Sequence, residues 1–112
     1  MVRSLKMRDV KELEELLSSY RFLKVEINDL KLRELEEQIN LKDEIKKRER
    51  KIARIDNAIK SLNHKERLVI NERYLEGMGR QSWKLISKSL FLSRTRCYEL
   101  KVSALNKLNK II

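Results

Sequence analysis

The segment from Ser82 to Leu108, SWKLISKSLFLSRTRCYELKVSALNKL, decides the fold. Its apolar residues recur at intervals of three and four, which is the period of a helix that buries one face. The first predicted helix buries Trp83, Ile86 and Leu90, and the second buries Cys97, Leu100, Ala104 and Leu108. Ser82 and Ser93 stand where the two helices begin, and a serine hydroxyl there can accept a hydrogen bond from a first-turn amide. Two short amphipathic helices joined by a tight turn predict a helix-turn-helix.

The second helix, predicted over residues 93–110, turns a polar and basic face outward. With roughly 100° between successive residues, the outward positions are Thr95, Tyr98, Glu99 and Val102, and the flanking positions are Arg94 and Arg96. A helix in the major groove of DNA presents its first turns to base edges, while flanking cations reach the phosphates on both walls. An ordinary solvated surface helix has a similar pattern, so both interpretations stay open at this point.

Composition and charge favour an all-α protein that binds a polyanion. Charged residues make up 39% of the 112 residues, proline is absent, and no stretch alternates between polar and apolar residues as a strand would. The net charge is +10, and residues 63–112 hold 11 basic against 4 acidic residues, whereas residues 1–62 hold 16 against 13. The excess therefore lies in the half with the predicted helix-turn-helix, as a nucleic-acid interface requires. An anionic membrane is the weaker alternative, because no helix sets bulky apolar residues against a lysine-rich face.

The lone cysteine and the N-terminal residues bear on compartment and cofactors. Because Cys97 is the only cysteine, no intrachain disulfide can form, and one ligand cannot define a zinc site. Cys97 lies on an apolar stripe, so we expect it to be buried. Charges interrupt the first ten residues, unlike a signal peptide, and no apolar run has the length of a membrane span. We therefore expect a cytoplasmic protein with no membrane partner, no metal and no cofactor.

Residues 1–62 form a charged helical segment with two apolar stripes. One stripe runs from Val10 to Leu30 and the other from Ile45 to Leu62, and the phase breaks between them. Asn40 is the predicted interruption, because asparagine tolerates the left-handed conformation that ends helices. A hairpin that folds back there would let the stripes bury each other, whereas a single helix of about 50 residues would pair with another chain as a coiled coil. The broken phase favours the hairpin, and either form offers helices for a homodimer.

Residues 63–112 form the predicted helix-turn-helix domain. The run Asn63-His64-Lys65-Glu66 has the form of a capping box at the start of a new helix. That helix is expected to end before Gly77-Met78-Gly79, which is typical of a cap and loop. The segment thus holds three helices, which would close a small core around Trp83. His64 would then lie at the surface rather than take a catalytic role.

The motifs LNHKERLVINERYLEG, SWKLISKSL and LSRTRCYELKVSALNKL, in this order, resemble region 4 of bacterial sigma-70-type factors. They resemble more closely the phage transcriptional regulators of the ArpU and RinA type. The matching residues are Glu66, Arg67, Arg73, Tyr74, Ser82, Trp83, Ile86, Leu90, Ser93, Tyr98, Ala104, Leu105, Lys107 and Leu108. The similarity covers residues 62–108. Phe91 departs from a position that is usually polar, and Ser87 from one that is usually glycine or alanine.

The resemblance implies a regulator that binds a promoter element through helix 93–110, in the cytoplasm of a bacterial host cell. The residues expected to contact DNA are Arg80, Ser82, Lys84, Ser93, Arg94, Thr95, Arg96, Tyr98, Glu99, Lys101 and Val102. The cations would attract phosphates, while Thr95, Tyr98 and Glu99 would read base edges. The expected partner is double-stranded DNA, while a homodimer through the N-terminal helices and contact with RNA polymerase are both left open.

Two other functions stay open. A helical adaptor could grip a protein partner, such as the polymerase, through residues 1–62 without reading DNA. A packaging protein resembling a phage terminase small subunit also combines a helix-turn-helix with coiled helices, although there the DNA-binding module usually comes first. Catalysis is not expected, because no glycine-rich phosphate loop is present and His64 has no evident nucleophile partner.

Overall fold

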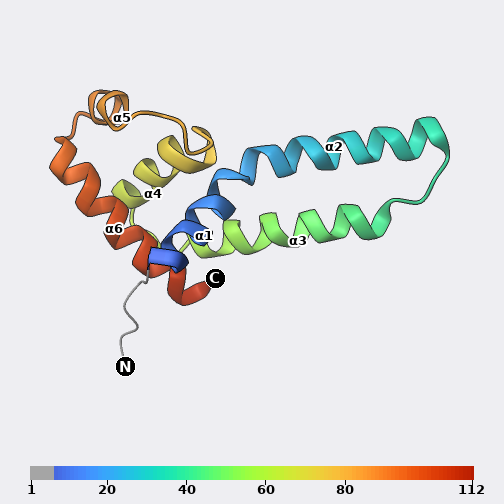
Figure 1. Cartoon of the computed structure of the whole chain (residues 1–112), viewed down its shortest axis with the longest axis horizontal. Helices are drawn as coiled ribbons and strands as arrows, with labels where there is room; N and C mark the ends of the chain where they lie inside the picture. Colours follow the sequence, from blue (N-terminus) through green and yellow to red (C-terminus); the bar gives the residue numbers. More distant parts are fainter. Residues whose placement is uncertain (1–6) are drawn as a thin grey trace.

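The computed structural model describes residues 7–112, with side chains from Val10 onward. The described chain consists of helices joined by short loops and contains no strand, which confirms the all-α class (Figure 1). The α-helices are α1 (Met7–Ser18), α2 (Tyr20–Glu37), α3 (Lys42–Ile59), α4 (His64–Ile70), α5 (Trp83–Leu90) and α6 (Arg94–Ile111), and η1 (Asn71–Leu75) is a π-helical turn that continues α4.

Helices α2 and α3 lie side by side and project from the rest of the molecule (Figure 1). The chain therefore has the hairpin rather than the single long helix. Gln38 is the residue in the left-handed conformation, with φ of 54°, so the prediction that Asn40 takes this role is wrong. Asn40 instead accepts a hydrogen bond from the Lys42 backbone N–H at 3.0 Å and so helps to start α3.

The inner faces of the hairpin are held by a small apolar cluster and by ion pairs. Ile27, Leu30 and Ile45 are buried between the two helices. Arg48 of α3 contacts Glu26 of α2 at 3.2 Å and Glu44 at 3.0 Å, and the second of these is an expected i,i+4 pair. At the base of the hairpin the Tyr20 hydroxyl donates to Asp56 at 2.5 Å.

The first arm is interrupted at Ser19, which separates α1 from α2. The Ser19 hydroxyl donates to the Leu16 carbonyl at 2.6 Å, a local bond that competes with the helical ladder. The break splits the apolar stripe of the sequence into two groups. Leu13 and Leu17 join the main core, whereas Ile27 and Leu30 serve the hairpin.

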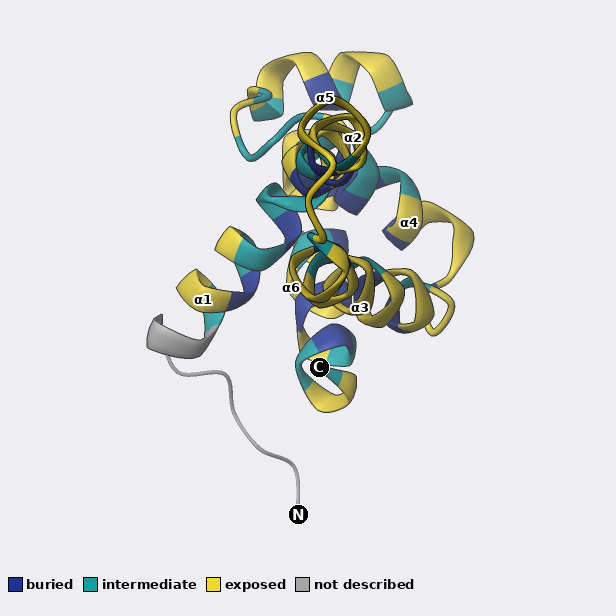
Figure 2. Cartoon of the chain, turned by 90° about the vertical axis from the view of Figure 1, so that its right-hand side faces the viewer, coloured by how far each residue is buried: buried dark blue, intermediate teal, exposed yellow. Residues whose placement is uncertain are grey.

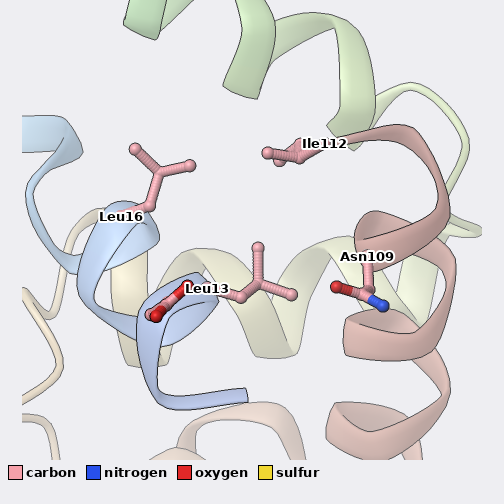
Figure 3. Close-up of a pocket in the computed structure, with 5 residues that line it drawn as sticks. Leu13, Leu16, Asn109 and Ile112 are labelled. Carbon is pink, nitrogen blue, oxygen red and sulfur yellow. The ribbon is translucent and has the colours of Figure 1, made fainter. Parts of the chain in front are cut away.

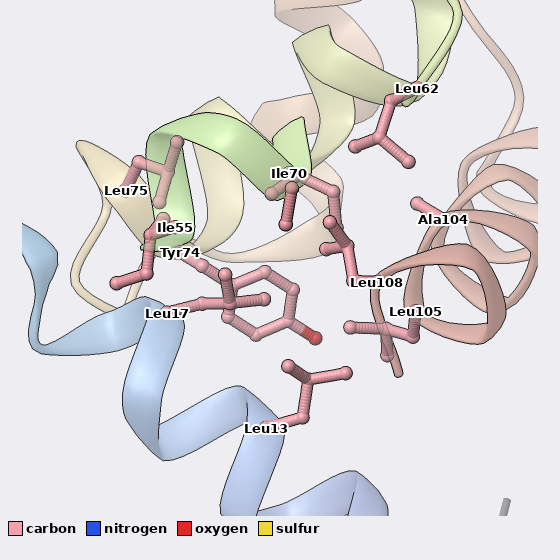
Figure 4. Packing of buried hydrophobic residues seen from close by; sticks show 11 residues of the cluster. Leu13, Leu17, Ile55, Leu62, Ile70, Tyr74, Leu75, Ala104, Leu105 and Leu108 are labelled. Atoms are coloured by element: carbon pink, nitrogen blue, oxygen red, sulfur yellow. The ribbon is translucent and has the colours of Figure 1, made fainter. Parts of the chain in front are cut away.

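The main core lies where α1, the base of α3, η1 and the C-terminal part of α6 meet (Figure 4). Its buried members are Leu13, Leu17, Ile55, Ala58, Leu62, Ile70, Tyr74, Leu75, Ala104, Leu105 and Leu108. The core thus joins residues from both sides of position 62. Tyr74 also donates its hydroxyl hydrogen to Glu14 at 2.5 Å, which ties α1 to η1.

The predicted capping box is present at the start of α4. Asn63 accepts from the Glu66 backbone N–H, and the Glu66 carboxylate accepts from the Asn63 backbone N–H, both at 2.9 Å. The helix then widens into η1, and the Glu76 N–H donates to the Asn71 carbonyl at 2.8 Å. In the loop that follows, Gly79 has φ of 74°, and a Cβ there would lie 2.5 Å from the Ser18 hydroxyl, so the loop approaches the α1–α2 junction closely.

Candidate nucleic-acid interface

Helices α5 and α6 form a helix-turn-helix with both predicted caps in place. The Ser82 hydroxyl accepts from the Leu85 N–H at 3.2 Å, and the Ser93 hydroxyl accepts from the Arg96 N–H at 3.0 Å. Phe91 ends α5 in the left-handed conformation, with φ of 56°, and its side chain is 94% exposed. The turn between the two helices is therefore short and well defined.

The inward face of α6 agrees with the predicted stripe. Cys97, Leu100, Ala104 and Leu108 are all buried, and Leu105 joins them. Burial raises the pKa of the Cys97 thiol above its ordinary value of 9.0, so this group is a neutral thiol at pH 7. Opposite this face, α5 buries Ile86 and packs against α4, η1 and α6. Both helices are thus fixed in orientation by their apolar sides.

The outward face of α6 is open to solvent. Thr95, Tyr98, Glu99 and Val102 are exposed, as are Ser93, Arg94 and Arg96, and the Tyr98 side chain is 60% exposed. Exposed residues also make up half of α5 (Figure 2). The N-terminal helices do not cover this ridge. A ridge of this kind on the second helix of a helix-turn-helix is what a major groove receives.

Several cations on α5, in the first turn of α6 and in the loop before α5 are exposed and unneutralised. Among the described side chains, Arg80, Lys84, Lys88 and Arg94 have no carboxylate partner. Lys88 is not among the residues predicted to contact DNA, although it follows Lys84 by four residues and so lies on the same face of α5. Free cations in this arrangement favour an anionic ligand.

Arg96 and Glu99 form an ion pair across one turn of α6, at 3.3 Å, with both side chains about half exposed. The sequence predicts separate roles for these residues, with Arg96 toward phosphate and Glu99 toward a base. An exposed pair of this kind contributes about 0–1 kcal/mol, so a ligand could separate it at little cost. The pair also cancels charge locally, which leaves Arg94 as the unpaired arginine of the first turn.

Trp83 does not occupy the centre of the core, so that prediction is wrong. Its side chain is partly buried and lies near two cations, with the Arg73 guanidinium 5.1 Å and the Lys101 ammonium 5.7 Å from the ring centre. Lys101 lies 5.2 Å from the Tyr98 ring as well. Cation–π contacts therefore hold Lys101 against α5, and its charge is less free than the sequence suggested.

Glu66 fixes α6 from beneath. It is only 1% exposed and accepts from Ser103 at 2.5 Å and from Lys107 at 2.8 Å, in addition to the Asn63 N–H. Burial alone would raise the pKa of the Glu66 carboxyl, but the hydrogen bonds from Lys107, Ser103 and the Asn63 backbone outweigh it, so the pKa is lowered. The sequence predicts only the cap, because Ser103 and Lys107 are distant from Glu66 along the chain.

Two hollows in the described surface have no residue of α5 and none of the exposed ridge of α6 in their linings, and Arg80 lines the second of them. One, of about 210 Å³, is lined by Glu12, Leu13, Leu16, Asn109 and Ile112 between α1 and the end of α6 (Figure 3). A second, of about 470 Å³, is open and lies between α1 and the loop after η1. Neither lining contains a histidine or a cysteine.

The described residues also contain no helix that is long and apolar enough to cross a membrane. Comparisons of the chain with protein-family models, with curated proteins and with solved structures found no match. The geometry of α5 and α6 is therefore the basis for assigning a function.

Proposed function

We propose that this protein is a sequence-specific DNA-binding transcriptional regulator that inserts α6 into the major groove of a promoter element. The observation that carries the proposal is the capped helix-turn-helix, whose second helix turns an exposed ridge outward beside unneutralised cations. The resemblance of residues 62–108 to sigma-70 region 4 and to phage regulators of the ArpU and RinA type supports it. By that resemblance the regulator is of the phage or prophage late-gene type and works in the cytoplasm of a bacterial host.

The proposal divides the interface by chemistry. Arg94, Lys84 and Arg80 provide the attraction to phosphates, together with Lys88, which shares the outer face of α5 with Lys84. Thr95 and Tyr98 of α6 would contact base edges, and both are exposed on the outward face. Glu99 can accept a hydrogen bond from a cytosine amino group once Arg96 turns from it toward a phosphate.

Selection of bound sites from random DNA duplexes tests sequence-specific reading, and the selected site then serves as the probe. Replacing Arg94 by alanine is expected to weaken binding, by roughly 1–3 kcal/mol or about 5- to 150-fold if its guanidinium contacts a base. The double variant Arg94→Ala, Arg96→Ala should lose more. The matched control is Lys46→Ala, Arg50→Ala, which removes two exposed cations from α3. Equal affinities of the two double variants would contradict the assignment of this face.

A salt titration separates DNA binding from the alternative of a protein adaptor. Binding driven by phosphate contacts should fall steeply with salt, by about 0.9 in the slope of log K against log salt for each phosphate neutralised. The adaptor would show little affinity for duplex DNA even at low salt. This alternative has one observation in its favour, which is the exposed apolar face of α2. The exposed apolar face of α2 is also a candidate binding surface for the other two proposed partners, a second copy of the chain and RNA polymerase.

A further inference from the structure

Helix α2 is apolar on two opposite faces, and the described part of the chain covers only one of them. Leu23, Ile27 and Leu30 are buried on the side toward α3. On the other side Phe22, Val25, Leu32 and Leu35 are 54–78% exposed. These four residues are the outer stripe of α2. Scattered exposed apolar residues are ordinary, but a stripe along four turns of one helix marks an interaction surface.

The outer stripe is self-complementary when α2 is read in both directions. About a point between Asn28 and Asp29, Val25 mirrors Leu32 and Phe22 mirrors Leu35. Arg21 likewise mirrors Glu36, so that a cation corresponds to an anion. With about 100° per residue, these positions fall within one side of the helix. If a second α2 packs against the first in the opposite direction, apolar residues of one helix face apolar residues of the other. Each Arg21 then faces a Glu36 of the other copy.

The charges at the two ends of the outer stripe are unpaired, unlike those on the inner face. Arg48 pairs with Glu26 across the hairpin and with Glu44 on its own helix. Among the described side chains, Arg21 and Glu36 have no ion-pair partner. Both are exposed and lie near opposite ends of α2.

We propose that the outer stripe of α2 binds the same stripe of a second copy, in an antiparallel pair with two-fold symmetry. Such an interface is isologous, so every contact occurs twice. The parallel arrangement is disfavoured, because each of the charged residues Arg21, Asp29 and Glu36 would then lie beside its own like-charged copy. In the antiparallel pair, the hairpin tip of each copy points toward the base of the other.

The pairing deepens the homodimer part of the proposed function, and its test uses no DNA. A failure to dimerise can therefore be distinguished from a failure to read DNA. One pair of helices of this length lies at the small end of stable interfaces, which bury about 1,200–2,000 Å². We therefore expect a dimer that dissociates on dilution.

The first experiment is sedimentation velocity of the full chain from about 1 µM to about 300 µM, where mass action should shift monomer to dimer. Leu32→Glu and Val25→Glu should each keep the protein monomeric over the whole range. Leu85→Glu is the control, because Leu85 is equally exposed (53%) but lies on α5, and it should dimerise as the wild type does. Circular dichroism at low concentration verifies that all three variants keep their helicity.

The second experiment exchanges the end charges. Arg21→Glu and Glu36→Arg, each alone, set like charges against each other twice per dimer and should weaken association about tenfold. The double variant Arg21→Glu, Glu36→Arg restores the attraction and should dimerise again. An equimolar mixture of the two single variants should form a heterodimer. In that heterodimer, position 21 and position 36 carry opposite charges wherever they meet across the interface.

Dimerisation of the wild type, its loss in Leu32→Glu and its recovery in the mixture would support the antiparallel pair. A wild type that stays monomeric at every concentration would overturn it and leave the outer stripe to a different protein. A dimer that survives Leu32→Glu and Val25→Glu would overturn it as well. If neither the double variant nor the mixture dimerises again, the helices do not pair in the antiparallel direction.

Discussion

At the scale of single residues, Glu66 has more contacts than its local motif requires. As a cap it needs only Asn63, but its carboxylate also binds Ser103 and Lys107 of α6. A buried carboxylate is costly unless it is paired and hydrogen-bonded, and here both oxygens have partners. Glu66 therefore links the start of α4 to the helix that is proposed to enter the groove.

Replacing Glu66 by glutamine should lower the free energy of unfolding by about 1.5–3 kcal/mol at pH 7, because hydrogen bonds to a charged group are lost in the interior. The folded-state pKa of Glu66 is lowered from 4.5, so its contribution is present above pH 4.5 and is lost as the pH falls through the folded pKa. Urea titrations at several pH values should show the difference between wild type and variant shrinking below pH 4.5. Glu76→Gln, at an exposed carboxylate, is the control and should change little.

Residue-scale features with a local cause could be predicted from the sequence. The caps at Ser82, Ser93 and Asn63 depend on neighbours within three residues, and all three are present. The placement of Trp83 depends on Arg73 and Lys101, which come from other helices. Hydrophobicity alone suggested a core position, whereas two cations hold the ring at a partly exposed site. Long-range polar contacts of this kind leave no periodic pattern in a sequence.

At the scale of elements, the end of α5 carries backbone strain. Phe91 adopts the left-handed conformation that glycine usually supplies at this point of a helix, and its side chain is 94% exposed. A residue with a Cβ is strained in the left-handed conformation, and the exposed Phe91 ring makes too few packing contacts to offset that strain. The sequence marks Phe91 as a departure from its family resemblance but does not show the strain.

Phe91→Gly is expected to stabilise the fold by about 0.5–1 kcal/mol, because glycine adopts this conformation without the steric penalty. Phe91→Ala keeps a Cβ and should show no such gain, which makes it the matched control. Thermal unfolding followed by circular dichroism measures both. Equal melting temperatures for the two variants would show that the left-handed turn is not strained.

The boundaries of the remaining elements depended on contacts that periodicity does not reveal. Apolar residues keep their spacing through Ser19, yet the helix breaks there, because the Ser19 hydroxyl bonds the Leu16 carbonyl and the two parts pack on different clusters. The widening of η1 is equally absent from the sequence pattern. The loss of phase between Leu30 and Ile45 did indicate the hairpin, since both arms must bury their stripes against each other.

At the scale of the whole molecule, the hairpin and the helix-turn-helix are joined through the main core. Residues of α1 and the base of α3 pack against η1 and α6 in one cluster (Figure 4). The α2 surface is therefore attached to α6 through packed helices rather than a flexible linker. A two-fold pairing through α2 would fix the relative orientation of two α6 helices.

Both proposals together predict that the selected DNA site is an inverted repeat, because a two-fold dimer presents its two recognition helices with the same symmetry. Wild-type protein should select two half-sites of opposite direction at one fixed spacing. Leu32→Glu should still select the half-site, since its α6 is unchanged, but with no fixed spacing and with weaker binding to the full repeat. Selection of a direct repeat would mean that α2 does not set the arrangement of two copies on DNA, and so would a fixed spacing retained by Leu32→Glu. Selection of a half-site alone would still support the reading of DNA by α6.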